Sequence, residues 1–185
     1  MRTLAVTQNI TIDGVIDLAG GWFAPGDDSA GLAEVNEVLQ KQAAGADSLL
    51  LGRVSFEDMR AFWPGQSDDT TGNTNYLNSV DKFVVSSTME DPRWQNTTIL
   101  HGDLHEEVTR LKSRPGKDIV ATGSITLVHE LIRLGLVDEY RLFIYPVVVG
   151  QGRRLFENAT SMLSLRLGEL QRFGNGIALA IYRIN

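Results

Sequence analysis

The sequence DIVATGSITLVHELIRLG, residues 118–135, places a strand, a turn and a helix in immediate succession. Residues 119–121 form a short apolar run, which predicts a buried strand. Small residues follow at 122–124, and apolar residues then recur at helical spacing up to Gly135, which is typical of the position after a helix. The N-terminus of such a helix can bind an anion, because its first N–H groups are unpaired and its dipole is positive there.

Taken alone, this unit has two interpretations. A strand, a turn of small residues and a helix also make up any ordinary βα unit. The turn Thr122-Gly123-Ser124 matches neither the GxGxxG pattern nor the spacing of the Walker phosphate loop. Whether the turn binds a ligand therefore depends on the residues that accompany it.

Two further strand ends carry groups that can bind phosphate. The apolar run 48–51 is followed by Gly52-Arg53-Val54-Ser55 and an amphipathic helix. Arg53 stands in the first turn of that helix, where a bound anion would offset its unfavourable interaction with the helix dipole. The run 82–85 is followed by the hydroxyls of Ser86-Ser87-Thr88. Because ligands of parallel sheets bind at the carboxyl ends of the strands, we expect the three segments to share one site.

The pattern as a whole predicts a three-layer α/β/α fold in a single domain, residues 1–185. Strands and helices alternate, which favours a mostly parallel central sheet, and Gly174-Asn175-Gly176 predicts a C-terminal antiparallel hairpin. Residues 64–79 are expected to form a polar loop. Further strands are expected at 3–10, 98–100, 140–149, 163–173 and 177–184, and further helices at 32–44 and 104–112.

Composition and charge argue against several kinds of function. The absence of cysteine excludes disulfides, thiolate metal sites and a cysteine nucleophile, and the three histidines form no metal motif. A net charge of −6 argues against a nucleic-acid or anionic-membrane surface. No apolar run reaches the roughly 20 residues that span a bilayer, and the start of the chain does not resemble a signal peptide. We therefore expect a cytoplasmic protein.

At this point the sequence resembles a known family, the dihydrofolate reductase-like proteins. Within that family it is similar to the reductase domain of bacterial riboflavin biosynthesis (the RibD C-terminal domain) and its small stand-alone relatives. The matching segments span nearly the whole chain in the same order. They are TIDGVI (11–16), LLLGRVSFE (49–57), KFVVSSTMEDPRWQNTTIL (82–100), VATGSITLVHELIRLGLVDEYRLFIYPVVVGQGRRLF (120–156) and the closing strand pair.

The resemblance implies an NADPH site across the three strand ends. Arg53 would meet the 2′-phosphate side and Ser55 the nicotinamide side, while Ser86 and Ser87 would help to hold the adenosine phosphate. The diphosphate would lie at the helix N-terminus that follows residue 124, which agrees with the anion-binding interpretation. The residues implied in cofactor binding are Gly52, Arg53, Ser55, Ser86, Ser87, Thr122, Gly123, Ser124, Ile125 and Leu127.

The sequence departs from the family pattern at two positions. The family's dihydrofolate reductases carry a glycine pair with a cis peptide where this chain has Thr122-Gly123. They also carry an arginine where Ile125 stands, which leaves Arg53 as the main candidate cation for a 2′-phosphate.

Three carboxylates are candidates for the catalytic acid. The resemblance implies a carboxylate on the first helix that assists protonation, and Asp28 and Glu34 are in that neighbourhood. Position and residue type favour a solvated loop or helix residue over a catalytic acid for each of them. Asp13 could face the nicotinamide or the substrate, although a turn-forming role fits it at least as well.

The resemblance implies an NADPH-dependent oxidoreductase that transfers hydride to a small, pterin-like or pyrimidine-like C=N or C=C substrate. Such an enzyme would be similar to dihydrofolate reductase or to 5-amino-6-(5-phosphoribosylamino)uracil reductase. The alternative is a non-catalytic NADPH-binding or nucleotide-binding regulatory module. We also expect a homodimer, because the strand at 140–149 and the terminal hairpin provide more apolar surface than a small sheet requires.

Overall fold

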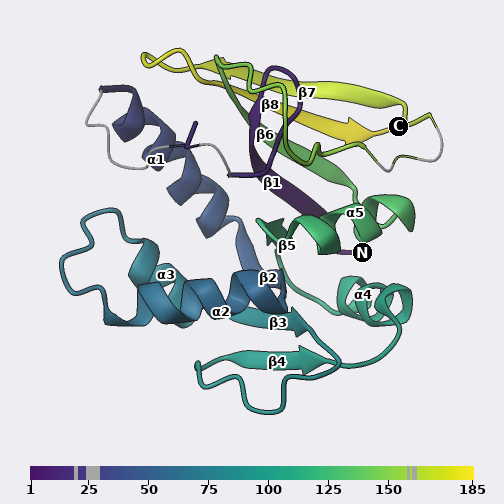
Figure 1. The fold of residues 1–185 in the computed structure, drawn as a ribbon. Coiled ribbons are helices and arrows are strands. Elements are labelled where there is room, and N and C mark those ends of the chain that lie inside the picture. Colours follow the sequence, from purple (N-terminus) through teal and green to yellow (C-terminus); the bar gives the residue numbers. More distant parts are fainter. Residues whose placement is uncertain (19–20, 24–29, 158, 160–161) are drawn as a thin grey trace.

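Eight strands form one sheet in the order β4-β3-β2-β5-β1-β6-β8-β7 (Figure 1). The structure is a computed structural model, and it describes residues 1–18, 21–23, 30–157, 159 and 162–185. The strands are β1 (Leu4–Thr11), β2 (Ala46–Gly52), β3 (Asp81–Val85), β4 (Thr97–Leu100), β5 (Asp118–Thr122), β6 (Glu139–Tyr145), β7 (Leu165–Arg172) and β8 (Ala178–Ile184). The helices are α1 (Ala30–Ala44), α2 (Arg53–Phe62), α3 (Asn73–Ser79), α4 (Leu104–Ser113) and α5 (Ile125–Arg133), with a 3-10 turn, η1, at Trp63–Gly65.

The sheet is parallel over most of its width and antiparallel at one end. β4, β3, β2, β5, β1 and β6 run parallel to one another, whereas β8 pairs antiparallel with both β6 and β7. The carboxyl ends of β2 and β5 therefore lie at the same edge as the carboxyl end of β1. The expected mostly parallel sheet with a C-terminal antiparallel hairpin is confirmed.

Helices cover both faces of the sheet, which makes three layers (Figure 1). On one face, α4 and α5 pack apolar side chains such as Val108 and Leu131 against β1, β5 and β2. On the other face, α2 and α3 pack against β2 and β3 through Phe56 and Leu77, and α1 packs against β6 and β8. Strand residues alternate between the two cores, as the period of two in a strand requires.

Two expected elements differ from the structure. The strand expected at 140–149 ends at Tyr145, because Pro146 has no N–H to continue the ladder. In the sheet it lies between β1 and β8. The expected polar loop at 64–79 contains η1 and α3. In α3, Leu77 is buried, which anchors a segment that is otherwise polar.

The expected homodimer stays a prediction, and the surface that could support it is not on β6. The edge strand β7 exposes Leu167 and Leu170, with 47% and 66% of each residue accessible. An exposed edge strand with apolar side chains is a common site of association between chains. Sedimentation at micromolar protein concentration tests this expectation, and a single monomeric species would contradict it.

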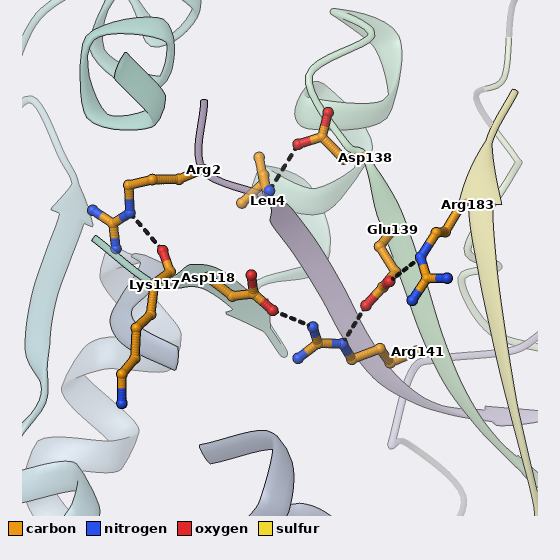
Figure 2. A network of polar contacts seen from close by, with 8 residues as sticks. All are labelled: Arg2, Leu4, Lys117, Asp118, Asp138, Glu139, Arg141 and Arg183. Carbon is orange, nitrogen blue, oxygen red and sulfur yellow. Dashed lines mark hydrogen bonds and ion pairs between the residues drawn. The ribbon is translucent and has the colours of Figure 1, made fainter. Parts of the chain in front are cut away.

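A buried network of charged residues lies at the sheet edge where the parallel strands begin (Figure 2). Glu139 on β6 is 5% exposed and accepts hydrogen bonds of 2.7 Å from Arg141 and from Arg183 of β8. Arg141 also donates to Asp118 of β5 at 2.6 Å. Next to this group, the backbone N–H of Leu4 donates to Asp138 at 2.8 Å. The network joins β1, β5, β6 and β8 at the edge opposite the carboxyl ends of β1, β5 and β6.

Lys82 of β3 is fully buried and holds the end of α3. Its Nζ donates to the carbonyl oxygens of Leu77 and Val80 at 2.7 and 2.8 Å, and it lies 4.7 Å from the centre of the Trp94 ring. These carbonyls are at the C-terminal end of α3, where a cation is favourable. Burial nevertheless lowers the pKa of Lys82 to about 8.

The depressed pKa of Lys82 predicts a change of stability at alkaline pH. An unfolded lysine keeps its proton up to a pKa of 10.5. Below about pH 8 the folded protein must therefore bury a charged lysine, and the full energetic penalty of that burial lowers its stability. This penalty is relieved as the pH rises from the folded pKa towards the unfolded one. Relative to Lys82→Met, the wild type should therefore gain about 2 kcal/mol of unfolding free energy between about pH 7 and about pH 9.5. Urea unfolding of both proteins measures this, and parallel pH profiles would contradict it.

In the part of the chain that the structure describes, no helix combines the length and apolar character needed to cross a bilayer.

Candidate functional site

A cleft of about 820 Å³ opens at the carboxyl ends of β1, β2 and β5. Its volume lies in the range of small-molecule and cofactor sites. Two of its walls are the first turns of α2 and α5, and a third is the segment that follows β1. The described lining residues are Gln8, Asn9, Ile16, Asp17, Leu18, Gly52, Arg53, Val54, Ser55, Asp58, Met59, Val85, Leu104, Thr122, Gly123, Ser124, Ile125, Thr126, Leu127, Glu130 and Arg153.

The turn between β5 and α5 has an unusual backbone. Gly123 has a φ of 58° and Ser124 a φ of 44°, so two successive residues are in the left-handed region. This conformation suits glycine but is costly for serine. No cis peptide is present among the described residues, so the turn differs from the cis-peptide pattern of the family's dihydrofolate reductases. The turn directs the first residues of α5 towards the cleft.

Two serines brace the turn against the start of α2. The N–H of Ser124 donates to the hydroxyl of Ser55 at 2.8 Å, and the N–H of Gly52 donates to the hydroxyl of Ser124 at 2.9 Å. A Cβ on Gly123 would lie 3.4 Å from the Ser55 hydroxyl, closer than most side chains are packed. The brace therefore fixes the first turns of α2 and α5 relative to each other.

Both helices leave their first N–H groups without a side-chain cap. The N-cap of α2 is Gly52, which has no side chain to cap the helix. The N-cap of α5 is Ser124, whose side chain makes no capping hydrogen bond to that helix. Residues of both first turns line the cleft, among them Arg53 and Ile125. Two helix N-termini and one arginine side chain therefore face the same space, which is an arrangement that attracts anions.

Gln8 orients the turn from β1. It is 5% exposed, and its Nε2 donates to the carbonyl oxygen of Gly123 at 2.7 Å. Leu4, Val6 and Ile10 occupy the same face of β1 and are all buried. A polar residue that interrupts this apolar series is a signal from which the sequence could have identified Gln8.

Most of the cofactor residues implied by the resemblance line the cleft. They are Gly52, Arg53, Ser55, Thr122, Gly123, Ser124, Ile125 and Leu127. The described lining does not include Ser86 or Ser87, although Val85 just before them belongs to it. The hydroxyl of Ser86 accepts hydrogen bonds from the N–H groups of Thr88 and Met89 at 3.3 and 3.0 Å, so it stabilises its own turn.

Of the three candidate carboxylates, the two that the structure describes, Asp13 and Glu34, do not belong to the described cleft lining. Glu34 is exposed on α1 and accepts a hydrogen bond of 3.0 Å from the N–H of Gly174, at the tip of the C-terminal hairpin. Asp28 lies outside the described residues. Asp13 is not part of the described lining, and it joins its own turn to residues 149–150. The structure thus gives a structural role to both Asp13 and Glu34.

Asp13 is held in its ionised form. A hydrogen bond of 2.6 Å from the Thr11 hydroxyl and one of 2.8 Å from the N–H of Gly150 lower the pKa of Asp13 to about 2. A carboxyl group with this pKa holds no proton near neutral pH and cannot donate one to a substrate.

Acid titration should reveal the structural role of Asp13. Its stabilising effect is complete above the unfolded pKa of 3.8 and is lost as the pH falls through the folded pKa of about 2. We expect Asp13→Asn to lower the melting temperature near neutral pH. The difference from the wild type should shrink between about pH 4 and about pH 2. Thermal melts followed by circular dichroism test this, and a difference that stays constant over that range would refute it.

The sequence analysis missed an ion pair in the cleft wall. Arg153 Nε donates to Asp17 Oδ2 at 2.9 Å, and both residues line the cleft. Their segments are also joined by the backbone, because the N–H of Ile16 donates to the carbonyl of Arg153 at 2.9 Å. The pairing joins positions that are 136 residues apart, so no local pattern in the sequence predicts it.

Solved structures with the same architecture identify the fold as dihydrofolate reductase-like. Dihydrofolate reductase from Enterococcus faecalis, in a complex with NADP(H) and RAB-propyl, matches with a TM-score of 0.60 and 16% identity over 99% of this chain and 96% of that one. The diaminohydroxyphosphoribosylaminopyrimidine deaminase/5-amino-6-(5-phosphoribosylamino)uracil reductase of Thermotoga maritima matches with a TM-score of 0.65 and 15% identity. That match covers 100% of this chain and 57% of the Thermotoga chain.

Within this fold, the chain belongs to the RibD C-terminal domain family, whose model matches residues 2–179. A relative in Bacillus subtilis (strain 168), the uncharacterized protein YyaP, is 31% identical over 189 residues. That similarity covers 100% of this chain and 96% of YyaP. The family and the fold are thus those that the sequence motifs predicted.

Proposed function

We propose that the protein is an NADPH-dependent reductase that transfers hydride to a small heterocyclic substrate with a C=N or C=C bond. The observation that carries this proposal is the convergence of two uncapped helix N-termini on one cleft beside Arg53. Membership of the RibD C-terminal domain family and the NADP(H) complex of the Enterococcus protein support it.

The residues of the cleft fit the phosphates of this cofactor. The N–H groups of residues 125–127 at the start of α5 would bind the diphosphate, and Arg53 would bind the 2′-phosphate. Gln8 and the two serines of the brace would keep these N–H groups in place. Gln8 and Ser55 hydrogen-bond to the turn, and the Ser124 hydroxyl joins the turn to Gly52. The bound cofactor would supply the hydride, and the chain would orient it and exclude water.

Binding and turnover can be tested separately. Saturation with NADPH at about a hundred times its Kd should stabilise the protein by about 2.7 kcal/mol, which raises the melting temperature by about 5 °C or more. Oxidation of NADPH, followed by its near-ultraviolet absorbance with dihydrofolate and a panel of unphosphorylated heterocycles, tests turnover. A melting temperature that does not respond to NADPH would rule out the proposal.

A second candidate is an NADPH-binding module without turnover. The placement of Asp13 and Glu34 outside the described lining favours it, because neither could then protonate a substrate in the cleft. A shift in melting temperature with no NADPH oxidation across the panel would favour this module over the reductase.

A further inference from the structure

Positive charge in the cleft is confined to two arginines. Among the described residues that line it, Arg53 and Arg153 are the only cations, whereas Asp17, Asp58 and Glu130 are acidic. The residues outside the described part of the chain include no lysine, arginine or histidine, so they cannot add a cation to the cleft. Among the side chains of the described lining, only these two arginines could therefore offer a positive charge to a phosphate bound in addition to those of NADPH.

Arg53 is committed to the cofactor end of the cleft. It is the first residue of α2, beside the braced turn, and its Nη1 lies 3.2 Å from Glu57 in an i,i+4 pair. The proposed function assigns it to the 2′-phosphate of NADPH. Arg153 is then the remaining cation for a phosphate on the substrate.

Arg153 is already neutralised by a carboxylate of the cleft wall. Asp17 accepts its hydrogen bond at 2.9 Å, and the Asp17 side chain is 23% exposed. Three backbone contacts hold the pair in place. The Ile16 N–H donates to the Arg153 carbonyl, Val15 forms a β-bridge with Arg154, and the Trp22 indole donates to the Asp17 carbonyl at 2.8 Å. The chain backbone thus keeps a negative charge beside the only cation that the substrate could use.

We propose that the cleft accepts an unphosphorylated, neutral or cationic heterocycle, and that Asp17 is the residue that excludes phosphorylated ones. This inference rests on the proposed reductase function and narrows its substrate class. Asp17 would repel a phosphate dianion. The phosphate could pair with Arg153 only if the ion pair between Arg153 and Asp17 were broken. A neutral ring meets no such penalty.

The test compares two ligands on the NADPH-saturated protein by titration calorimetry. The probes are 5-amino-6-(5-phosphoribosylamino)uracil and its dephosphorylated counterpart. The wild type should bind the phosphorylated probe no more tightly than the other. Asp17→Asn removes the negative charge at nearly constant size and releases Arg153, so affinity for the phosphorylated probe should rise about tenfold. Affinity for the dephosphorylated probe should change much less, because that probe carries no phosphate to pair with Arg153.

The double variant Asp17→Asn/Arg153→Gln is the matched control. It lacks the arginine, so its affinity for the phosphorylated probe should not rise above that of the wild type. The inference would be overturned if the wild type bound the phosphorylated probe more tightly than the dephosphorylated one. It would also be overturned if Asp17→Asn did not raise the affinity for the phosphorylated probe. The wild-type comparison requires no variant to fold. NADPH binding is titrated first without either probe, so failure of the reductase proposal is distinguished from failure of the substrate assignment.

Discussion

Replacing Arg53 with glutamine should weaken NADPH binding by about tenfold or more and leave NADH binding nearly unchanged. The expected selectivity arises because the two cofactors differ by the 2′-phosphate, and Arg53 is the main candidate to pair with it. Its side chain is 48% exposed, so solvent screens the interaction and keeps the effect below that of a buried pair. Titration calorimetry of both cofactors against both proteins measures this difference.

Two further variants act as controls for Arg53. Arg93→Gln removes an arginine that is 78% exposed and outside the described cleft lining, so cofactor affinities should not change. Glu57→Gln removes the carboxylate that now pairs with Arg53, so NADPH should bind equally well or more tightly. If Arg53→Gln lowers the affinities for NADPH and NADH equally, Arg53 does not recognise the 2′-phosphate.

Glu139→Gln should destabilise the fold more than any other change considered, by about 3 kcal/mol. Glu139 is 5% exposed and lies between Arg141 and Arg183 (Figure 2). Its loss would leave the buried Arg141 with Asp118 as the carboxylate partner that remains, and removing one member of a buried ion pair is costly. Denaturant unfolding at neutral pH measures the loss.

Arg183→Gln is the matched comparison, since it removes the outer partner of the same carboxylate. The Arg183 side chain is 51% exposed, so its loss should cost less than about 1 kcal/mol. Neither variant should alter NADPH affinity, because the network lies at the sheet edge opposite the cleft. A Glu139→Gln protein as stable as the wild type would show that the network does not stabilise the fold.

The sequence predicted the architecture because the signals that decide it are local. Apolar runs, helical spacing and the Gly174-Asn175-Gly176 turn each lie within a few residues and match the observed elements. The helix α3 was missed because its sequence, which is polar except near Leu77, gives no clear helical periodicity. The buried network was also missed, since only the strand order brings Asp118 and Glu139 to the same arginine.

The difference between local and long-range signals also explains which parts of the cleft the sequence predicted. The part of the cleft that we propose to bind the cofactor consists of strand–turn–helix junctions, whose glycines and serines are contiguous in the sequence around Gly52 and Gly123. The other end is formed by Asp17 and Arg153, which meet only after β1 and the segment beyond β6 come together. Asp28 and Glu34 were candidate acids because they are near the first helix, and Asp13 because of its place in the turn at residues 12–16. The structure shows instead that Asp13 and Glu34 hold a loop and a hairpin.

A crystal structure of the protein with NADPH is the most direct test of the cofactor site. We predict that the diphosphate contacts the N–H groups of residues 125–127, with Gly123 and Ser124 in the turn beside it and the 2′-phosphate next to Arg53. The nicotinamide should then point along the cleft towards Asn9 and Asp17. A diphosphate bound away from the start of α5 would contradict the central claim.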